Sequence, residues 1–478
     1  MHPAAIPRPA LLATIFAFNF IEFLQSGMVV FATAPTMGHI GAAPEEYALA
    51  TSLYAAVAVL AISQMTVLIQ RLGWRDYLLG AALLCAAGAW TCAATDTLAG
   101  FIAGRVLMAA GGGAFMTAAR MLVNLIPPSP ARFFGIAAFA GALSSGLATS
   151  SWLAATMIER EAWSGIFLVL ALLALLAGAF ALRWLPPTAA TLDAAPSRFH
   201  LGDGLALGGG VFLVLYGLQR LAYDWHGRRA DVVLLLACGA GLALLFYAGQ
   251  RRRARPFLRL EMLKNSRYLT GLAIFTFCYT ALGVFNAVLP QLVQRVLGVA
   301  IVQAGQLQSA GMALALPVFA CALAVIRKRP HATKFYVTGF LSLAAFGWRF
   351  AHLDPAVPAW TGVAPWIGLF GVFVFVSMAT TALHSFKDFQ QDNVLFAHAQ
   401  QFKNMLGQVG IALGAGVGTV LLQERGALHG ARLAEQAAAG PALLAQQGSL
   451  LAGLDVFLAL ACCGVAGAVL LSMQRRFD

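Results

Sequence analysis

Long apolar stretches separated by short polar gaps dominate the chain. A helix needs about 20 apolar residues to cross about 30 Å of hydrocarbon, and about fourteen stretches of this kind can be counted. They cover 10–34, 46–69, 76–95, 98–123, 133–157, 164–184, 203–222, 231–250, 268–290, 300–325, 334–351, 362–384, 398–423 and 449–473. Only helices fit, because an open sheet would leave unpaired backbone groups in lipid. The pattern predicts an all-α integral membrane fold.

The stretches fall into groups of six, two and six. The sequence predicts a six-helix bundle in 1–184, two accessory transmembrane helices with their linkers in 185–267, and a second six-helix bundle in 268–478. Duplicated halves are typical of secondary transporters. No soluble stretch is long enough for a nucleotide-binding domain, and the G-x-x-x-x-G-K-[ST] motif is absent. We therefore expect a transporter rather than an enzyme or an ATP-driven pump.

Composition agrees with a chain that has lipid as its solvent. The sequence is 60% hydrophobic and 10% charged, whereas soluble domains are about 45–50% apolar and about 25% charged. The net charge of +12 does not indicate nucleic acid, because the basic residues occupy short gaps between apolar stretches. Alternate gaps are rich in Lys and Arg, as the positive-inside rule describes. This places both termini in the cytoplasm, with 219–231 and 424–436 as outer gaps that carry several arginines.

Two ionisable residues lie well inside predicted spanning helices of the first half. Glu22 lies near the middle of the first helix, with Asn19 and Gln25 one turn away on the same face, and Arg105 lies in the fourth. A charged group inside the membrane is costly and marks a functional site by default. Glu22 and Arg105 are our candidates for proton coupling, and Asn19 and Gln25 for the substrate cavity. The alternative is a static ion pair that joins two helices.

The second half carries polar residues without fixed charge. Tyr279, Asn286, Gln291 and Gln294 follow the helix in 268–290 to its outer end, and Asn404 and Gln408 share a face of the helix in 398–423. Such groups suit hydrogen bonding to a varied organic ligand, so Tyr279, Asn286, Gln291, Asn404 and Gln408 are candidates for the substrate cavity. Ordinary bonds between helices, worth about 0.6 kcal/mol each, are the alternative.

The histidines, the possible metal ligands and the glycines give weaker indications of function. His384 and His398 flank a predicted cytoplasmic loop and are expected to be solvated, and the sequence shows no metal-binding motif. No cofactor is expected. Gly410, Gly414 and Gly418 repeat every four residues and form a smooth helix face, which is either a sliding surface or plain tight packing.

Several segments together resemble the major facilitator superfamily, in its fourteen-helix drug:proton antiporter branch. In "TVLIQRLGWRDYLLG", Arg71, Gly73 and Arg75 match the loop that follows the second helix in that family. In "GRVLMAAGGGAF", Arg105 and Gly113 match its fourth-helix signature. The fifth-helix signature survives as "GLATSS", and "LQRLAYDWHG" resembles the loop between the two extra helices. The resemblance covers nearly the whole chain.

The resemblance implies two six-helix bundles around a central cavity that opens to one side at a time. Arg71, Gly73 and Arg75 would form the gating loop. Gln25 stands where the family has an acidic residue, and Glu22, one turn earlier, could substitute for it. The fifth-helix signature, which the family associates with export, has Leu147 in place of its proline.

The expected function is proton-coupled export of small organic, drug-like or toxic compounds across the bacterial cytoplasmic (inner) membrane. Its partners would be the substrate, protons and the lipid bilayer. The resemblance adds a periplasmic adaptor and an outer-membrane channel, for which 424–448 is the candidate docking segment. A narrow-specificity metabolite transporter and a transport-inactive sensor or scaffold are the alternatives.

Overall fold

The protein is described from a computed structural model. It describes residues 8–127, 129–186, 201–224, 227–253, 256, 258–328, 331–354, 356–389, 391–436, 441–474 and 477. Within these residues every regular element is a helix. The N-terminal part contains α1 (Arg8–Phe31), α2 (Thr33–Ile40), α3 (Pro44–Ala94), α4 (Leu98–Gly112), α5 (Phe115–Leu122), η1 (Val123–Leu125), α6 (Arg132–Glu159) and α7 (Gly165–Trp184).

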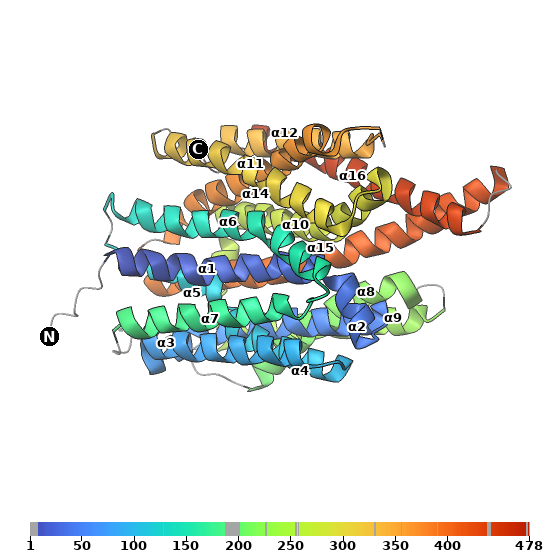
Figure 1. Ribbon diagram of the computed structural model, residues 1–478. Coiled ribbons are helices and arrows are strands. Elements are labelled where there is room, and N and C mark those ends of the chain that lie inside the picture. Colours follow the sequence, from blue (N-terminus) through green and yellow to red (C-terminus); the bar gives the residue numbers. More distant parts are fainter. Residues whose placement is uncertain are drawn as a thin grey trace.

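The accessory and C-terminal parts follow the same pattern. They contain α8 (Leu201–Asp224), α9 (Arg229–Arg252), η2 (Glu261–Lys264), α10 (Ser266–Leu297), α11 (Ile301–Lys328), α12 (Ala332–Ala351), α13 (Ala359–Gly362), α14 (Ala364–His384), η3 (Lys387–Phe389), α15 (Asn393–Gln436) and α16 (Pro441–Met473). Figure 1 shows these helices running roughly side by side.

The predicted membrane fold is confirmed. Among the described residues, twelve helices are long and apolar enough to cross a membrane. One of them, α3, has 51 residues and would be about 76 Å long at 1.5 Å per residue, so it contains two spans. With α12, of 20 residues, the helices correspond to the fourteen predicted stretches. Large apolar side chains cover the outside of the bundle, among them Trp90, Leu172 and Leu470, which are 58–68% exposed.

Gly73 divides α3 into its two spans. Its backbone angles are φ 82° and ψ 168°, a region that only glycine occupies without strain. The chain therefore reverses inside one continuous helical segment. The helix predicted for 98–123 is also interrupted, since α4 ends at Gly112 and α5 begins at Phe115.

Close helix packing depends on small residues in both halves. A Cβ atom on Gly88 or Gly104 would collide with the partner helix, because α3 and α4 meet backbone to backbone there. In the second half, Gly347 of α12 lies against the backbone of α16 in the same way. The two halves also pair their helices alike: α1 packs on α6 as α10 packs on α15, and α3 on α7 as α12 on α16.

The two bundles meet along two seams. One seam joins α3 to α15 and the other joins α6 to α11. At the second seam, Trp152 donates its backbone N–H to the Ser309 hydroxyl at 2.8 Å, and Gly305 lies against the Ser151 carbonyl. The accessory helix α8 covers the first seam, where Gln219 donates to the Ser52 hydroxyl at 2.9 Å.

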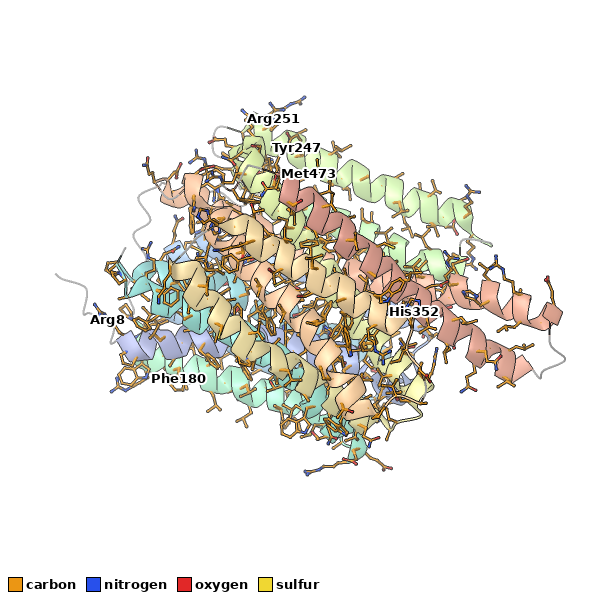
Figure 2. The ribbon with its side chains drawn as sticks, turned by 90° about the horizontal axis from the view of Figure 1, so that it is seen from above. Arg8, Phe180, Tyr247, Arg251, His352 and Met473 are labelled. Carbon is orange, nitrogen blue, oxygen red and sulfur yellow. The ribbon has the colours of Figure 1, made fainter. Side chains whose placement is uncertain are left out.

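The two ends of the helices differ in character. Figure 2 places Arg8, Phe180, Arg251 and Met473 toward one end and His352 toward the other. We call these the basic end and the hairpin end. At the hairpin end, α15 and α16 extend beyond the other helices as an antiparallel pair (Figure 1). Because α15 has 44 residues, it is about 66 Å long, roughly twice the thickness of the hydrocarbon layer.

At the basic end, Asp392 caps α15. Its carboxylate accepts the backbone N–H groups of Leu395 and Val394 at 2.9 and 3.0 Å, which satisfies donors that a helix start otherwise leaves free. It also pairs with Arg259 at 3.0 Å. The Leu395 bond, together with the Arg259 charge, lowers the pKa of Asp392 below its ordinary value.

Substitution at Gly73 tests the division of α3. We expect Gly73→Ala to destabilise the purified protein by about 1–3 kcal/mol, because alanine cannot adopt these angles without strain. The measurement is the midpoint of thermal unfolding in detergent. Gly80→Ala is the matched control, since a Cβ there meets nothing within 4 Å. Equal midpoints for the two variants would contradict the assignment.

Candidate functional site

A cavity of about 330 Å³ lies between the two bundles in the half of the molecule nearer the hairpin end. Its walls come from the second half of α1, the first turns of α3, and the outer parts of α8, α10 and α15. Most of the lining surface is apolar, and the polar side chains that line it include Gln25, Thr51, Tyr54, Arg105, Gln219, Gln291 and Gln408. An apolar cavity with a few polar groups is the usual form of a small-molecule site. We call it the outer cavity.

Glu22 lies directly behind the outer cavity. Its side chain is 2% exposed, and Oε1 accepts a hydrogen bond from Gln408 Nε2 at 2.6 Å. Gln408 itself lines the cavity. The second oxygen, Oε2, is buried without a hydrogen-bond partner. Since α1 belongs to the first bundle and α15 to the second, this hydrogen bond joins the bundles through a carboxyl group.

Arg105 reaches the same cavity from α4. Its guanidinium stacks over the Tyr54 ring, with 3.9 Å from Cζ to the ring centre, and Gln25 donates to the Tyr54 hydroxyl at 2.5 Å. No ion pair joins Arg105 to Glu22 among the described residues, although Arg105 is near enough to act on the Glu22 charge. In this conformation the guanidinium is therefore available to a ligand.

The remaining predicted cavity residues lie elsewhere. Asn19 donates to the Phe139 carbonyl at 2.6 Å, Asn286 accepts from Gln308 at 3.1 Å, and Asn404 donates to the Thr117 hydroxyl at 2.7 Å. Each of these bonds joins two helices, and none of the three asparagines lines the outer cavity. Gln291 does line it, whereas Tyr279 lies deeper.

The half of the bundle interface nearer the basic end is closed by polar contacts. Gln401 of α15 donates to the Ile62 carbonyl of α3 at 2.8 Å. Asn404 bonds to Thr117 one turn further along, and the Tyr279 hydroxyl contacts Met116 Sδ at 3.1 Å. The protein is thus open to one end and closed to the other.

The predicted solvation of two histidines is wrong. His384 is 1% exposed and its Nδ1 lies 2.9 Å from the Thr380 carbonyl. His398 is 3% exposed and accepts the Arg259 backbone N–H at 3.0 Å. His384 is the last residue of α14, and His398 lies within α15, which begins at Asn393, before the start expected from hydropathy. Across the described part of the chain, no group of three or more His, Cys, Asp or Glu side chains could hold a metal ion.

The three residues predicted to form the gating loop lie at the basic end. Gly73 forms the reversal in α3, and Arg75 Nε pairs with the carboxylate of its neighbour Asp76 at 2.8 Å. Arg71 is exposed. Two of the three predicted gating residues therefore surround a turn that glycine alone makes possible.

Gly410, Gly414 and Gly418 provide the contact surface between α15 and α10. A Cβ on Gly410 would lie 3.0 Å from Tyr279, and one on Gly414 would collide with the Thr280 carbonyl. One on Gly418 would lie 3.0 Å from Val288. The stripe packs the two helices tightly together, which favours the packing interpretation.

Sequence reasoning missed four side chains at the interface: Tyr54, Arg120, Gln401 and Lys403. Lys403 is 3% exposed and lies inside α15, five positions into the helix expected for 398–423. Its charge within an apolar stretch was a usable signal. Tyr54 and Gln401 gave none, since an uncharged polar side chain within a predicted span can equally make an ordinary bond between helices.

Comparison with known proteins agrees with this architecture. The profile of the Major Facilitator Superfamily matches residues 15–415. The uncharacterised transporter YebQ of Escherichia coli is 28% identical over 275 residues, which are 56% of this chain and 57% of that protein. The Cronobacter sakazakii protein named for multidrug resistance, MdtD, is 24% identical over 87% of this chain and 88% of its own length.

Solved structures show the same fold. A bacterial homologue of the human lysosomal transporter Spinster, in an inward-facing and unoccupied conformation, superposes with a TM-score of 0.63. It is 13% identical, and the match covers 99% of this chain and 98% of that one. Two helix bundles with a cavity between them on one side of the membrane, and polar contacts that close the other side, are typical of membrane transporters. The chain belongs to the major facilitator superfamily.

The polar seal predicts how conformations are populated. We expect Gln401→Leu to favour opening at the basic end by about threefold for each hydrogen bond lost, because a bond between helices is worth about 0.6 kcal/mol. Gln401 Nε2 donates to the Ile62 and Ser63 carbonyls and the Thr66 hydroxyl. The measurement is the distance distribution between spin labels at Arg71 and Lys387, both exposed, in a cysteine-free background.

Gln400→Leu is the matched control for this experiment. Gln400 is the preceding residue, is 1% exposed, and neither of its side-chain polar atoms has a partner. Its replacement should leave the distribution unchanged. The same shift in both variants would mean that the Gln401 bond does not hold the basic end closed.

Proposed function

We propose that this protein is a proton-coupled secondary transporter that exports small organic compounds across the cytoplasmic membrane. The observation that carries the proposal is Glu22, a buried carboxyl group hydrogen-bonded across the bundle interface at the base of the outer cavity. A carboxyl group in this place can bind a proton. Because it lies between the bundles, its protonation changes the contact between them.

The free oxygen of Glu22 is where a proton would bind. Gln408 occupies Oε1, so protonation at Oε2 leaves that hydrogen bond in place and removes the buried negative charge. Neutralising a charge away from water relieves a large desolvation cost. The neutral state is then free to move between the two access states, because no unpaired carboxylate has to be carried through a closed interface.

Arg105 would link the proton to the substrate. Its guanidinium lines the outer cavity without a carboxylate partner among the described residues. Loss of the Glu22 proton restores a negative charge close to this cation, and a ligand bound at Arg105 competes with that charge. Substrate and proton therefore favour different states, which is what exchange across a membrane requires.

The orientation of the chain follows from its charges. Arg8 and Arg251 lie at the basic end (Figure 2), and positive residues collect on the cytoplasmic side. The outer cavity would then face outward, with both termini inside. The names of relatives such as MdtD support drug-like substrates, and the apolar lining suits amphipathic or aromatic molecules.

Glu22→Gln tests the coupling. Purified protein is placed in liposomes with an imposed pH gradient, and substrate-dependent proton movement is recorded with a panel of organic compounds. We expect pH-driven transport to be lost while substrate binding changes by less than about threefold, because the amide keeps a hydrogen bond to Gln408. Glu22→Asp should retain part of the activity.

Asp203→Asn is the matched control for Glu22→Gln. Asp203 is the other buried carboxylate of the described residues, 7% exposed, and it bonds to Gln250 and Arg253 away from the outer cavity. Normal pH-driven transport in Glu22→Gln would show that the proton site is elsewhere. A single transported compound would favour a metabolite transporter, and no transport of any compound would favour a sensor or scaffold.

We also propose that the α15–α16 hairpin is the docking surface for a periplasmic adaptor and its outer-membrane channel. The hairpin extends past the other helices (Figure 1). It carries Arg425 and His429 around Asp455, with His429 Nε2 at 2.9 Å and Arg425 Nε at 3.7 Å from Oδ2. Beside it lies a groove of about 610 Å³ lined by both helices.

Shortening the hairpin separates docking from transport. We expect replacement of 431–447 by a short Gly-Ser turn to reduce compound resistance in cells and to leave transport in liposomes intact, because the outer cavity lies deeper in the bundle. Resistance assays and liposome uptake measure the two effects. Equal loss in both would show that the hairpin serves folding rather than docking.

A further inference from the structure

A second cavity, of about 40 Å³, lies between the bundles on the side of Glu22 nearer the basic end. We call it the inner cavity. The contacts of Gln401 with α3 and of Asn404 with α5 hold the bundles together in the same half of the interface. In this conformation the inner cavity holds no more than a few water molecules, and opening of the basic end would enlarge it.

Lys403 reaches the inner cavity from α15. Its side chain is 3% exposed, and its ammonium lies 4.4 Å from the centre of the Phe275 ring. None of the residues that the structure describes offers it a hydrogen-bond acceptor or a carboxylate. A cation–π contact offsets part of the desolvation of an ammonium ion, but it provides no counter-charge.

Arg120 lines the same cavity from α5. Its Nη1 is buried without a hydrogen-bond partner, and its guanidinium lies 6.0 Å from the centre of the Phe396 ring. Arg120 is also near enough to Lys403 to repel it. Two like charges thus share one small space, and the described lining includes no acidic side chain.

A buried charge without a partner destabilises the protein unless another group compensates that charge. Removing one partner from a buried ion pair costs about 3–5 kcal/mol, so two cations that have no partner among the described residues would be stabilised by an anion supplied by a ligand. The rest of the lining is aromatic and aliphatic. Phe319 and Phe375 contact each other with tilted rings, 5.6 Å between their centres, and Phe275 and Tyr279 stack with 6.2 Å between theirs.

We propose that the inner cavity is the substrate site of the state open to the basic end, and that it selects small aromatic carboxylates. The carboxylate would bind between Lys403 and Arg120, and the ring would lie among Phe275, Tyr279 and Phe319. The proposal rests on the transport function proposed above and names its substrate class. Cationic compounds are disfavoured there, because they would meet two positive charges.

The test measures binding at equilibrium, without a pH gradient. The full-length protein in phosphatidylcholine nanodiscs is titrated calorimetrically with 2-naphthoate, with the neutral 2-naphthamide and with the cationic 2-naphthylmethylamine. We expect 2-naphthoate to bind most tightly. Lys403→Gln should weaken it by about 10–100-fold, the range for a hydrogen bond to a charged group, and leave 2-naphthamide unchanged.

Two further variants keep the result interpretable. Lys403→Arg should retain most of the affinity for 2-naphthoate, since it restores the positive charge. Lys334→Gln is the matched control: Lys334 also lies over a phenylalanine, Phe335, at 5.1 Å, but it is exposed and lines neither cavity. Its replacement should leave binding of all three compounds unchanged.

Three outcomes would overturn the proposal. They are equal affinity of wild type and Lys403→Gln for 2-naphthoate, tighter binding of the cation than of the anion, and displacement of 2-naphthoate by phosphatidylglycerol but not by a second soluble aromatic carboxylate. The last would make a lipid headgroup the occupant. Binding as expected without pH-driven transport would instead contradict the proposed function and leave the inner site standing.

Discussion

The absence of water in the bilayer core is the constraint on which this structure depends. Every backbone N–H and C=O group there has to be satisfied within the protein, and helices do this without help from a neighbour. Packing between helices then depends on close approach rather than on the hydrophobic effect. Gly88 against α4 and Gly347 against α16 show how the chain achieves it.

The same constraint makes the polar side chains informative. A buried polar group in lipid finds a partner within the chain or remains costly. Asn19, Asn286 and Asn404 each have one such partner on a neighbouring helix, while the other polar atom of each amide has none among the described residues. Glu22 is satisfied at one oxygen only, and Lys403 has no acceptor among the described residues. These two ionisable groups border the two cavities, where a proton or a ligand can complete them.

Much of the fold could be predicted from hydropathy, because the length of an apolar stretch and the thickness of the bilayer are directly related. The role of Gly73 could also be anticipated from its place in a short basic gap. The site was harder to predict. Asn404 and Gln408 lie one turn apart on the same face of α15, yet Asn404 meets Thr117 and Gln408 meets Glu22.

The position of a residue along its helix and the identity of the residue opposite it decide such contacts. Neither can be predicted from the sequence of one segment alone. His384 and His398 illustrate the same limit. His398, for example, accepts a hydrogen bond from the backbone of Arg259, which lies in a segment distant in sequence. Lys403 was within reach, because a lysine inside an apolar stretch already demands an explanation.

The glycine face of α15 has a mechanical consequence. Gly410 and Gly414 of α15 leave almost no space against α10. The two helices α10 and α15 would therefore move as one rigid unit. Lys403 of the inner cavity and Gln408 of the outer cavity are about 7.5 Å apart on it, and its far end is the protruding hairpin (Figure 1). A force applied to the hairpin outside the membrane would act on the same body that carries both sites, so docking and binding would be linked through leverage rather than through contact.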